Sequence, residues 1–500
     1  MASVSTPSPA LRDAAVVQLS SGAVSGIASE DGTRRYLGIP YAAPPVGARR
    51  WRPPTPPEPW AGIRPAVAFG ADCPQQTQAQ SRAARQSEDC LYLNVWAPPV
   101  GEEKRPVMVW LHGGSFVHGS GSDLRCDGDA FARAGIVLVT VNYRVGLFGF
   151  LAHPALIRDS AEGSAGNYGL LDQLAALRWV RENIAGFGGD CDRVTVFGVS
   201  AGSASISLLL VSPLAAGLFQ RAILHSPGAF RPLASLEHAA EAGRALGDDL
   251  AALRLLPAEA LRAKTGLLTP KMRGLTTPRV LRPIRDGWVI PEDERPAFLG
   301  GRFHAMPVIV GSNADEGTNL VATWPIRTIP EYKALIAENF GDWAEEALEQ
   351  YPVREEADVR RQLAMLFADT QFNYGVASLA RVMARARPTW RYLFLRRRPG
   401  RPDGPHHGEE VAYVFGTLDT AFATQTPSFD GTDRMISRAM LSAWAGFAES
   451  GDPNGDGLAA WPGSETGGES YLEFGDTICV SQGWRARQLA FLDRFFARSP

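Results

Sequence analysis

The sequence predicts an α/β fold with a central, mostly parallel sheet and helices on both of its faces. Short apolar runs of the kind that form fully buried strands recur along the chain, and helix-length segments separate them. Hydrophobic residues make up 45% and charged residues 21% of the 500 residues, which is typical of a globular protein and excludes bulk disorder. No internal repeat or linker divides the chain, so we expect one domain over residues 1–500.

The expected strands are apolar runs that end at turn-forming residues. Residues 107–112 (VMVWLH) predict a buried strand because nearly all are apolar, and two glycines follow them. Residues 16–70 mix shorter β-like runs with Gly/Pro turns, so we expect additional N-terminal β elements there. The other central strands are expected at residues 136–144, 193–197, 222–225, 306–311 and 390–395.

The expected helices alternate with these strands. Residues 169–185 space their apolar side chains along one helix face, and the apolar stretch 204–211 indicates a second helix. Residues 232–300 and 325–385 are helix-like and longer than a simple crossover needs, so we expect cap-like insertions over one edge of the sheet. In such sheets, functional groups gather at the carboxyl ends of the strands.

Charge and hydropathy narrow the possible partners. Lys and Arg number 50 against 53 Asp and Glu, and this net charge of −3 argues against nucleic acid held by bulk charge. No apolar run reaches the roughly 18 residues of a membrane span. The first residues lack a basic segment with an apolar core, which predicts a cytoplasmic protein unless an export signal has been removed. The sequence leaves the oligomeric state open between a monomer and a weak dimer.

The chain has five cysteines, too few for a disulfide framework. Because five is odd, at least one is unpaired within the chain. We expect buried thiols, with one disulfide as the alternative. The cysteines are Cys73, Cys90, Cys126, Cys191 and Cys479.

Residues 198–202 (GVSAG) fit the pattern G-x-S-x-G between an expected strand and an apparent helix. A strand-to-helix turn this tight needs small residues beside Ser200, and it lifts the serine hydroxyl above the sheet. Alone the pattern is weak, and a plain turn with a solvated serine is the alternative. Its place between a strand and a helix favours a nucleophile.

A serine nucleophile requires a base and an orienting acid. With this strand-to-helix turn, the chain order is Ser, then acid, then His. Of the eight histidines, only His406 and His407 lie beyond the late strand expected at 306–311. The segment after that strand offers Asp315 and Glu316. Order and topology therefore leave two carboxylates and two imidazoles open.

Acyl transfer also needs donors for the oxyanion of the tetrahedral intermediate. Gly113 and Gly114 follow an expected strand, and paired glycines let backbone N–H groups approach a substrate oxygen. The N–H of Ala201, at the start of the helix after Ser200, is the third candidate. A simple turn with positive φ is the alternative for the two glycines.

Longer segments resemble the type-B carboxylesterases, an α/β-hydrolase family that includes bacterial carboxylesterases and cholinesterases. Residues 87–96 (SEDCLYLNVW) together with 194–203 (VTVFGVSAGS) make the resemblance specific. It implies an α/β-hydrolase fold and a serine carboxylesterase that acts on small-molecule esters through an acyl-enzyme, with no cofactor and no metal. The resemblance covers roughly residues 16–500 and is also carried by residues 38–47, 110–116, 142–151, 166–190, 311–318 and 407–416.

Carried over residue by residue, the resemblance assigns the catalytic roles. In the implied mechanism, a histidine deprotonates the serine as the serine attacks an ester carbonyl, and a glutamate holds the imidazole. His406 is then a neighbour in the loop. The resemblance implies Ser200 as nucleophile, His407 as base, Glu316 as acid, and Gly113, Gly114 and Ala201 as oxyanion donors.

The resemblance also implies contacts that hold the scaffold together. Cys73 and Cys90 look like the family's N-terminal disulfide pair, which closes a loop near the pocket. Ser226 matches a serine that lies behind the triad. The implied buried ion pairs join Arg50 to Glu88 and Arg144 to Asp172.

The chain departs from the family's pattern around the pocket. Val199 stands where the family commonly has Glu, and Cys126 stands where Tyr is common, so a cholinesterase-like site for quaternary ammonium is not expected. His225 replaces a common glutamine. The candidate substrate-binding residues are Ser115, which replaces the third glycine of the usual motif, Phe116, Arg125, Val199, His225 and Arg231.

Three hypotheses follow. The first is a serine esterase for short-chain or aryl esters. The second is an enzyme similar to the fumonisin esterases, which cleave tricarballylic ester side chains; here Arg125 or Arg231 would bind a carboxylate on the acyl part rather than pair with nearby acids. The third, from another class, is a non-catalytic, neuroligin-like binding protein, which is not expected because all the triad residues are present.

Overall fold

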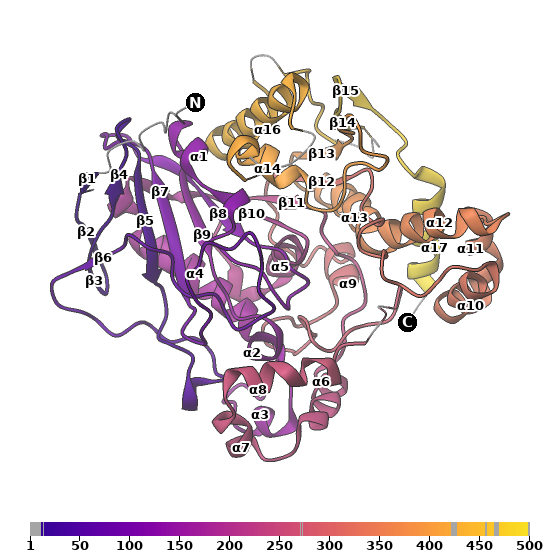
Figure 1. Cartoon of the computed structure of the whole chain (residues 1–500), viewed down its shortest axis with the longest axis horizontal. Coiled ribbons are helices and arrows are strands. Elements are labelled where there is room, and N and C mark those ends of the chain that lie inside the picture. The colour runs from indigo at the N-terminus through magenta and orange to yellow at the C-terminus, as the bar shows by residue number, and fades with distance from the viewer. Residues whose placement is uncertain are drawn as a thin grey trace, which may run out of the picture.

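A mixed sheet forms the centre of the computed structural model, which describes residues 12–13, 15–270, 272, 274–421, 428–455, 458–464 and 470–498. Seven neighbouring strands are parallel, and antiparallel strands extend the sheet at both edges (Figure 1). In spatial order, the parallel strands are β9 (Val137–Val141), β8 (Arg105–Leu111), β10 (Gly189–Val199), β11 (Arg221–His225), β12 (Val308–Asn313), β13 (Thr389–Phe394) and β14 (Tyr471–Phe474).

The antiparallel strands lie outside this parallel block. Beyond β9 they are β7 (Tyr92–Ala97), β5 (Arg34–Pro40), β4 (Ile27–Ala28) and β1 (Arg12–Asp13). At the other edge, β15 (Ile478–Ser481) pairs with β14. A separate small sheet contains β2 (Val17–Leu19), β3 (Gly22–Ser25) and β6 (Ile63–Pro65).

The predicted fold class, a mostly parallel central sheet flanked by helices with N-terminal β elements, is confirmed. Each of the six expected central strands lies in the parallel block. The sequence does not predict β14 and β15, because each spans only 4 residues and neither belongs to a long apolar run.

Alternate side chains of the central strands face two different cores, as the period of a β-strand requires. On β8, Val107 and Val109 face the core that contains α4 (Tyr168–Asn183), α5 (Ala201–Val211) and α13 (Tyr374–Met383). Met108 and Trp110 face the opposite core. That second core is covered by α1 (Asp129–Arg133), α14 (Glu410–Val414) and α16 (Gly431–Ser450).

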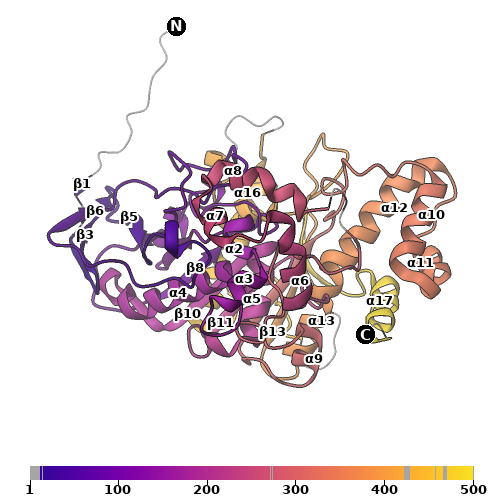
Figure 2. The same cartoon turned by 90° about the horizontal axis from the view of Figure 1, so that it is seen from below.

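The second of the two long segments expected as insertions is largely helical, and the first contains several short helices. In Figure 1 the helices of residues 236–262 lie at the bottom, the helix at 294–299 lies nearer the centre, and the helices of residues 329–368 lie at the right beside the C-terminal helix α17 (Ala486–Arg498); Figure 2 shows the molecule from below. Helix α13 packs on β12 and β13, so part of the second segment covers the sheet. The helices are α6 (Leu236–Gly243), α7 (Leu250–Leu255), α8 (Ala258–Arg262) and α9 (Glu294–Leu299), then α10 (Ile329–Phe340), α11 (Ala344–Gln350), α12 (Glu356–Ala368) and α13.

Shorter helices complete the architecture. A π-helix, Asp369–Asn373, joins α12 to α13. Within the part of the chain that the structure describes, every helix is too short or too polar to cross a membrane. Besides α1 and α14, the short α-helices described outside the two insertions are α2 (Gly146–Phe150), α3 (Pro154–Arg158) and α15 (Leu418–Ala421).

Candidate active site

Ser200 occupies the tight turn between β10 and α5. Its φ of 57° and ψ of −117° are unusual for a residue with a side chain, and its backbone N–H donates to the carbonyl oxygen of His225 at 2.9 Å. A Cβ at Gly202 would lie 2.0 Å from the carbonyl oxygen of Leu111, and a Cβ at Gly198 would lie 2.6 Å from the same atom. Only glycine fits at both positions, so the G-x-S-x-G segment forms the strand-to-helix turn that its pattern predicts.

Glu316 follows β12 and is fully buried. One carboxylate oxygen, Oε1, accepts hydrogen bonds from the Ser226 hydroxyl at 2.5 Å and from the Asn313 backbone N–H at 2.6 Å. The other oxygen, Oε2, contacts Nδ1 of His407. Each oxygen therefore has a defined partner, and the carboxylate is held in one orientation. Ser226 contacts Glu316 on the side away from His407, which agrees with the position that the resemblance implies for it.

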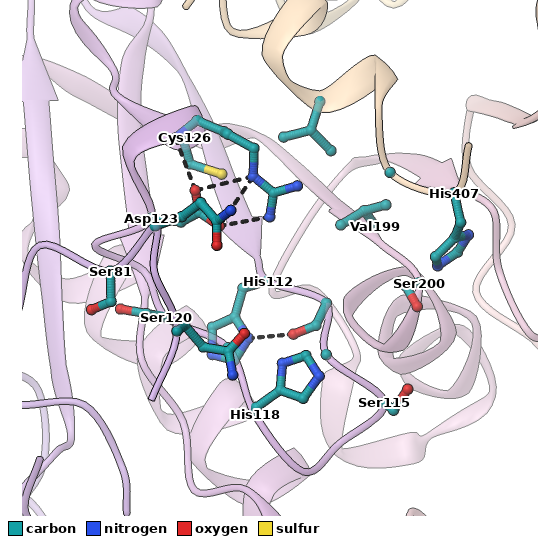
Figure 3. Close-up of a pocket in the computed structure, with 18 of the residues that line it drawn as sticks. Ser81, His112, Ser115, His118, Ser120, Asp123, Cys126, Val199, Ser200 and His407 are labelled. Carbon is teal, nitrogen blue, oxygen red and sulfur yellow. Dashed lines mark hydrogen bonds and ion pairs between the residues drawn. The ribbon is translucent and has the colours of Figure 1, made fainter. Parts of the chain in front are cut away.

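His407 belongs to the loop that follows β13. Its ring stacks on Phe372, with ring centroids 4.4 Å apart and planes at 26°. The other ring nitrogen, Nε2, is buried and has no hydrogen-bond partner among the described residues. His407 and Ser200 line the same end of one pocket (Figure 3). The imidazole thus contacts a buried carboxylate at one nitrogen, and its other nitrogen has no partner within the described part of the chain.

The neighbouring pair, Asp315 and His406, lies apart from this contact. Asp315 accepts a hydrogen bond from the Thr318 backbone N–H at 3.1 Å, and its carboxylate is 3.9 Å from Nε2 of His406. His406 also contacts the Arg401 guanidinium, at 3.0 Å from Nδ1. Of the two carboxylates and two imidazoles that chain order leaves open, the structure therefore joins Glu316 to His407 and brings Asp315 close to His406.

The loop after β8 brings Gly113 and Gly114 against the serine. A Cβ at Gly113 would lie only 3.1 Å from Cβ of Ser200, so the backbone at this position approaches the serine closely. Gly114 has a φ of 115°, and the left-handed conformation continues through Ser115 at 56°. The N–H of Ala201 is in the first turn of α5, directly after the serine. Gly113 and Ala201 therefore lie beside Ser200, and Gly114 lines the same pocket.

His112 fixes the start of this loop. Its ring stacks on Tyr143 with centroids 4.1 Å apart, and Nδ1 lies 2.8 Å from the carbonyl oxygen of Gly113. Burial lowers the pKa of His112 to about 4, so the ring is neutral near pH 7. A neutral ring with its proton on Nδ1 donates to the Gly113 carbonyl and orients the peptide that carries the Gly114 N–H.

The pocket beside Ser200 has a volume of about 220 Å³ and two different sides. Near the serine it is apolar, with contributions from Val199, Leu320 and Phe372. The far wall is polar and comes from two loops of the N-terminal part of the chain (Figure 3). The polar residues of this far wall are Gln78, Gln80, Ser81, His118, Ser120, Asp123 and Arg125.

Three of the candidate substrate-binding residues line this pocket: Ser115, Arg125 and Val199. The Arg125 guanidinium is paired with Asp123, with Nη2 at 2.7 Å from Oδ2 and Nε at 3.1 Å from Oδ1. Burial opposes the charge of Arg125, but the Asp123 carboxylate raises its pKa above the ordinary value. Arg125 therefore reaches the pocket as a cation that already has an acidic partner.

The structure corrects two other candidates. Phe116 is not in the pocket lining; it is buried and packs edge-to-face on Phe150, with centroids 5.2 Å apart. His225 is fully buried, with Nδ1 at 2.9 Å from the Tyr392 hydroxyl, and Nε2 accepts a hydrogen bond from the Trp444 indole at 3.0 Å. Both face the core because their strand or loop turns the side chain away from the pocket.

Arg231 is the third correction. Its side chain is buried outside the pocket lining, where Nη1 donates to Oε1 of Gln371 at 2.5 Å and Nη2 donates to the Leu275 carbonyl at 3.4 Å. An arginine in this position holds other segments together. Of the two arginines expected to bind an acyl carboxylate, only Arg125 is in reach of the pocket.

The two buried ion pairs implied by the resemblance are confirmed. Arg50 and Glu88 approach to 2.5 Å, and Arg144 and Asp172 to 2.7 Å. Arg144 and Asp172 are almost completely buried, so loss of one partner would leave an uncompensated charge in the core.

The implied disulfide between Cys73 and Cys90 is absent, which corrects that expectation. Both are buried free thiols. The Val145 backbone N–H donates to Sγ of Cys73 at 3.4 Å, and a hydrogen bond between the two cysteines, together with burial, raises the pKa of Cys90. The loop is thus held by hydrogen bonds and packing.

One group of metal-ligand type exists among the described residues. Asp190, Cys191 and Asp192 bring their ligand atoms within 4.8 Å of one another at the start of β10. This is the opposite end of the strand from Ser200, and Asp190 is already paired with Arg193 at 3.1 Å. The group has no connection with the pocket.

Sequence reasoning misses Phe372 and most of the polar far wall. Phe372 lies in a helical insertion, where its spacing resembles that of any buried aromatic residue. Gln78 and Gln80 lie in an irregular segment with no motif. Only the loop geometry brings these side chains to the pocket.

The sheet, the strand-to-helix serine and the buried carboxylate–imidazole contact define an α/β hydrolase. The chain belongs to the carboxylesterase family: residues 13–492 match the family model described as "Carboxylesterase family". It is similar to fumonisin B1 esterase of Sphingopyxis macrogoltabida, with 45% identity over 93% of this chain and 87% of the relative. It is also 36% identical to para-nitrobenzyl esterase of Bacillus subtilis (strain 168), over 89% of this chain and 92% of the relative.

Solved structures agree with this family. A PNB esterase has a TM-score of 0.83 and 33% identity, and a thermophilic PNB esterase has 0.85 and 32%. Each comparison covers 95% of this chain and 99% of the other. The protein is a carboxylic ester hydrolase.

Proposed function

We propose that this chain hydrolyses small-molecule carboxylic esters through Ser200, His407 and Glu316. Nε2 of His407 accepts the serine proton as Oγ attacks the ester carbonyl, and Glu316 holds the Nδ1–H and stabilises the cation that forms. The contact between His407 and the buried Glu316, next to a serine on a strand-to-helix turn, is the observation that supports this proposal.

The N–H groups of Gly113, Gly114 and Ala201 bind the oxyanion in this proposal. Their backbone positions are fixed before substrate arrives, by the glycine turns and by the start of α5. His407 then gives the proton to the leaving alcohol. In the second half of the reaction it deprotonates water, which attacks the acyl-enzyme and releases the acid.

The test uses p-nitrophenyl esters and a fluorophosphonate probe. The parent protein should hydrolyse the esters and carry one covalent label on the peptide that contains Ser200. In Ser200→Ala the label should be absent and turnover should fall by about 10⁴-fold or more, with the fold intact. Turnover within about tenfold of the parent would remove Ser200 from the mechanism.

A second candidate substrate is an ester whose acyl part carries further carboxylates. Two observations favour it: Arg125 lines the pocket, and a relative with 45% identity is named fumonisin B1 esterase. Arg offers planar, bidentate recognition of carboxylate, although Asp123 already occupies part of it here.

The acyl preference is tested with a neutral butyrate ester and a tricarballylate ester. If Arg125 binds the acyl carboxylate, Arg125→Ala should lower the tricarballylate-to-butyrate ratio of kcat/KM by about tenfold. Arg231→Ala should leave the ratio unchanged, because Arg231 lies outside the pocket. A parent that prefers butyrate, with the same ratio in both variants, would leave only the generalist esterase.

A further inference from the structure

A residue that lines the pocket lies on the π-helix between α12 and α13, Asp369–Asn373. π-Helices are rare and often occur at functional sites, because the extra residue redirects the side chains of one turn. All five side chains of this π-helix are buried. One of them, Phe372, reaches the pocket and stacks on the imidazole of His407.

The two ends of the π-helix are fixed by polar contacts. Asp369 accepts hydrogen bonds from Nε of Arg485 at 2.9 Å, from the Tyr351 hydroxyl at 3.0 Å and from the Asn373 amide at 2.8 Å. The Asn373 side-chain oxygen in turn accepts from the Ser312 hydroxyl at 2.9 Å. Ser312 belongs to β12, the strand that leads to Glu316. The π-helix and the acid are therefore tied to the same strand.

The middle of the π-helix is fixed by Gln371. Its side-chain oxygen accepts from Arg231, and its amide donates to the Leu275 carbonyl at 3.0 Å. Residues 369, 371 and 373 are thus each held by a separate partner. Phe372, between two of these anchors, is left 7% exposed and has little freedom to move.

Among the described residues, the His407 side chain makes one hydrogen bond, from Nδ1 to Glu316. A single hydrogen bond sets a direction but allows the ring to rotate about it, which would move Nε2 away from Ser200. A flat aromatic face at 4.4 Å and 26° removes that rotation. We propose that Phe372, mounted on the π-helix, is a positioning residue that sets the ring plane of His407. Arg231 helps to hold the π-helix in place, because it donates a hydrogen bond to Gln371.

This inference rests on the proposed function, since it assigns His407 as the base. It competes with a simpler role for Phe372 as an apolar wall for the acyl chain. The two roles predict different kinetics. A wall affects long acyl chains more than short ones and acts mainly on KM. A positioning residue affects every ester equally and acts on kcat, because the base is used in both half-reactions.

The experiment compares Phe372→Leu, Phe372→Tyr and the control Phe340→Leu, with p-nitrophenyl acetate and butyrate. Phe340 is also buried but packs on Phe495 with centroids 4.9 Å apart, outside the pocket lining. Phe372→Leu should lower kcat for both esters by the same factor, about 10- to 100-fold, with KM within about twofold. Phe372→Tyr should restore most of the rate, and Phe340→Leu should stay within about twofold of the parent.

The downfield NMR signal of the His407 Nδ1 proton supplies a second readout. It should be sharp in the parent and in Phe372→Tyr, and broadened in Phe372→Leu, because a ring that rotates exchanges this proton faster. A rate loss that grows from acetate to butyrate, or one no larger than that of Phe340→Leu, would make Phe372 only a wall. An unchanged Nδ1 signal in Phe372→Leu would also overturn the proposal.

A further variant keeps the test decisive if Phe372→Leu does not fold. Gln371→Met keeps the volume and the Phe372 ring but removes the anchor to Arg231, and kcat should fall by about three- to tenfold for both esters. An unchanged kcat would show that the position of the π-helix does not affect the reaction. If His407→Ala retains activity, the proposed function fails; if it does not and the Phe372 and Gln371 variants are fully active, only this inference fails.

Discussion

The two sides of the pocket are built in different ways. On the catalytic side, Ser200 and Glu316 leave the ends of central strands, and backbone groups or buried donors hold each of them. On the far wall, Ser81 and Arg125 come from loops outside the sheet, and mainly side chains hold them, such as the Asp72 carboxylate for Ser81 and Asp123 for Arg125.

This difference separates the reaction from the choice of substrate. Groups set by strand register cannot shift without disturbing the sheet, which suits a reaction that depends on distances of a few tenths of an ångström. Loop side chains can be exchanged one at a time at little cost to the fold. We expect substitutions on the catalytic side to reduce the rate for every ester, and substitutions on the far wall to change the ratio between esters.

The largest effect is expected at Glu316, the proposed acid. Glu316→Gln should lower turnover by about 10³- to 10⁴-fold, because an amide cannot stabilise the imidazolium and favours the wrong tautomer. Asp315→Asn should change turnover by less than about threefold, since Asp315 lies beside His406. Steady-state kinetics with p-nitrophenyl acetate measures both. The reverse ranking would assign the acid to Asp315.

The next effect is expected at the oxyanion loop. In Gly113→Ala the new methyl group would lie 2.9 Å from the Val199 carbonyl oxygen and 3.1 Å from Cβ of Ser200, so the loop must shift. Loss of one aligned donor should cost about 10²- to 10³-fold in kcat. Gly431→Ala, which has open space around it, is the matched control. Equal rates in the two variants would show that the Gly113 backbone is not part of the reaction.

A smaller effect, confined to selectivity, is expected on the far wall. Asp123→Asn keeps an acceptor for the Arg125 backbone but removes the negative charge that occupies its guanidinium. If Arg125 binds acyl carboxylates, kcat/KM for a tricarballylate ester should rise by about three- to tenfold, while that for p-nitrophenyl acetate stays within about twofold. A parallel change for both esters would contradict the separation between the two sides.

The smallest effect on turnover is expected at Glu294, beneath the nucleophile helix α5. This glutamate is fully buried, accepts hydrogen bonds from Ser207 on α5 and from the Phe230 backbone N–H, and burial raises its pKa from 4.5 to about 7. Between these two values the folded state holds a proton that the unfolded state has lost. Its contribution to stability is therefore complete below pH 4.5 and is lost as the pH rises to about 7, in total about 3 kcal/mol.

Glu294→Gln mimics the protonated acid and should remove most of this dependence. The unfolding free energy of the variant minus that of the parent should increase from pH 4.5 to pH 8. At each pH, the kcat of the variant should equal that of the parent. Urea unfolding at the two pH values, followed by circular dichroism, measures the difference. A parent and a variant with the same pH dependence would show that Glu294 is ionised in the folded protein at pH 4.5–7.

The sequence predicts the strands well because a strand buried on both faces leaves a continuous apolar run. The strand-to-helix turn at Ser200 is equally accessible, since its glycines are required by close approach to Leu111. The choice between Asp315 and Glu316 cannot be made from the sequence pattern, because a shift of one residue after β12 decides which carboxylate faces His407. The family resemblance selects Glu316, whereas chain order alone leaves both carboxylates open.

Other features leave no local signal. The extra residue of the π-helix has no periodic signature, so the stacking of Phe372 on His407 cannot be read from spacing. From the sequence alone, Arg231 is a candidate for ligand binding. The structure shows that it donates to Gln371 instead, a partner 140 residues away that the sequence does not indicate. Whether Cys73 and Cys90 are thiols or a disulfide depends on redox conditions as well as on their proximity, which sequence alone does not supply.

The distance along the chain between the acid and the base has a consequence for biosynthesis. Glu316 and His407 are 91 residues apart, and the His407 loop follows β13, which must first insert beside β12. The Asn313 side chain then fastens this loop through the His406 carbonyl oxygen at 2.6 Å. A nascent chain on the ribosome that ends before β13 thus carries the proposed nucleophile, Ser200, and the proposed acid, Glu316, without the proposed base, His407. The incomplete chain should therefore not hydrolyse esters until β13 has been synthesised and the loop after it has docked.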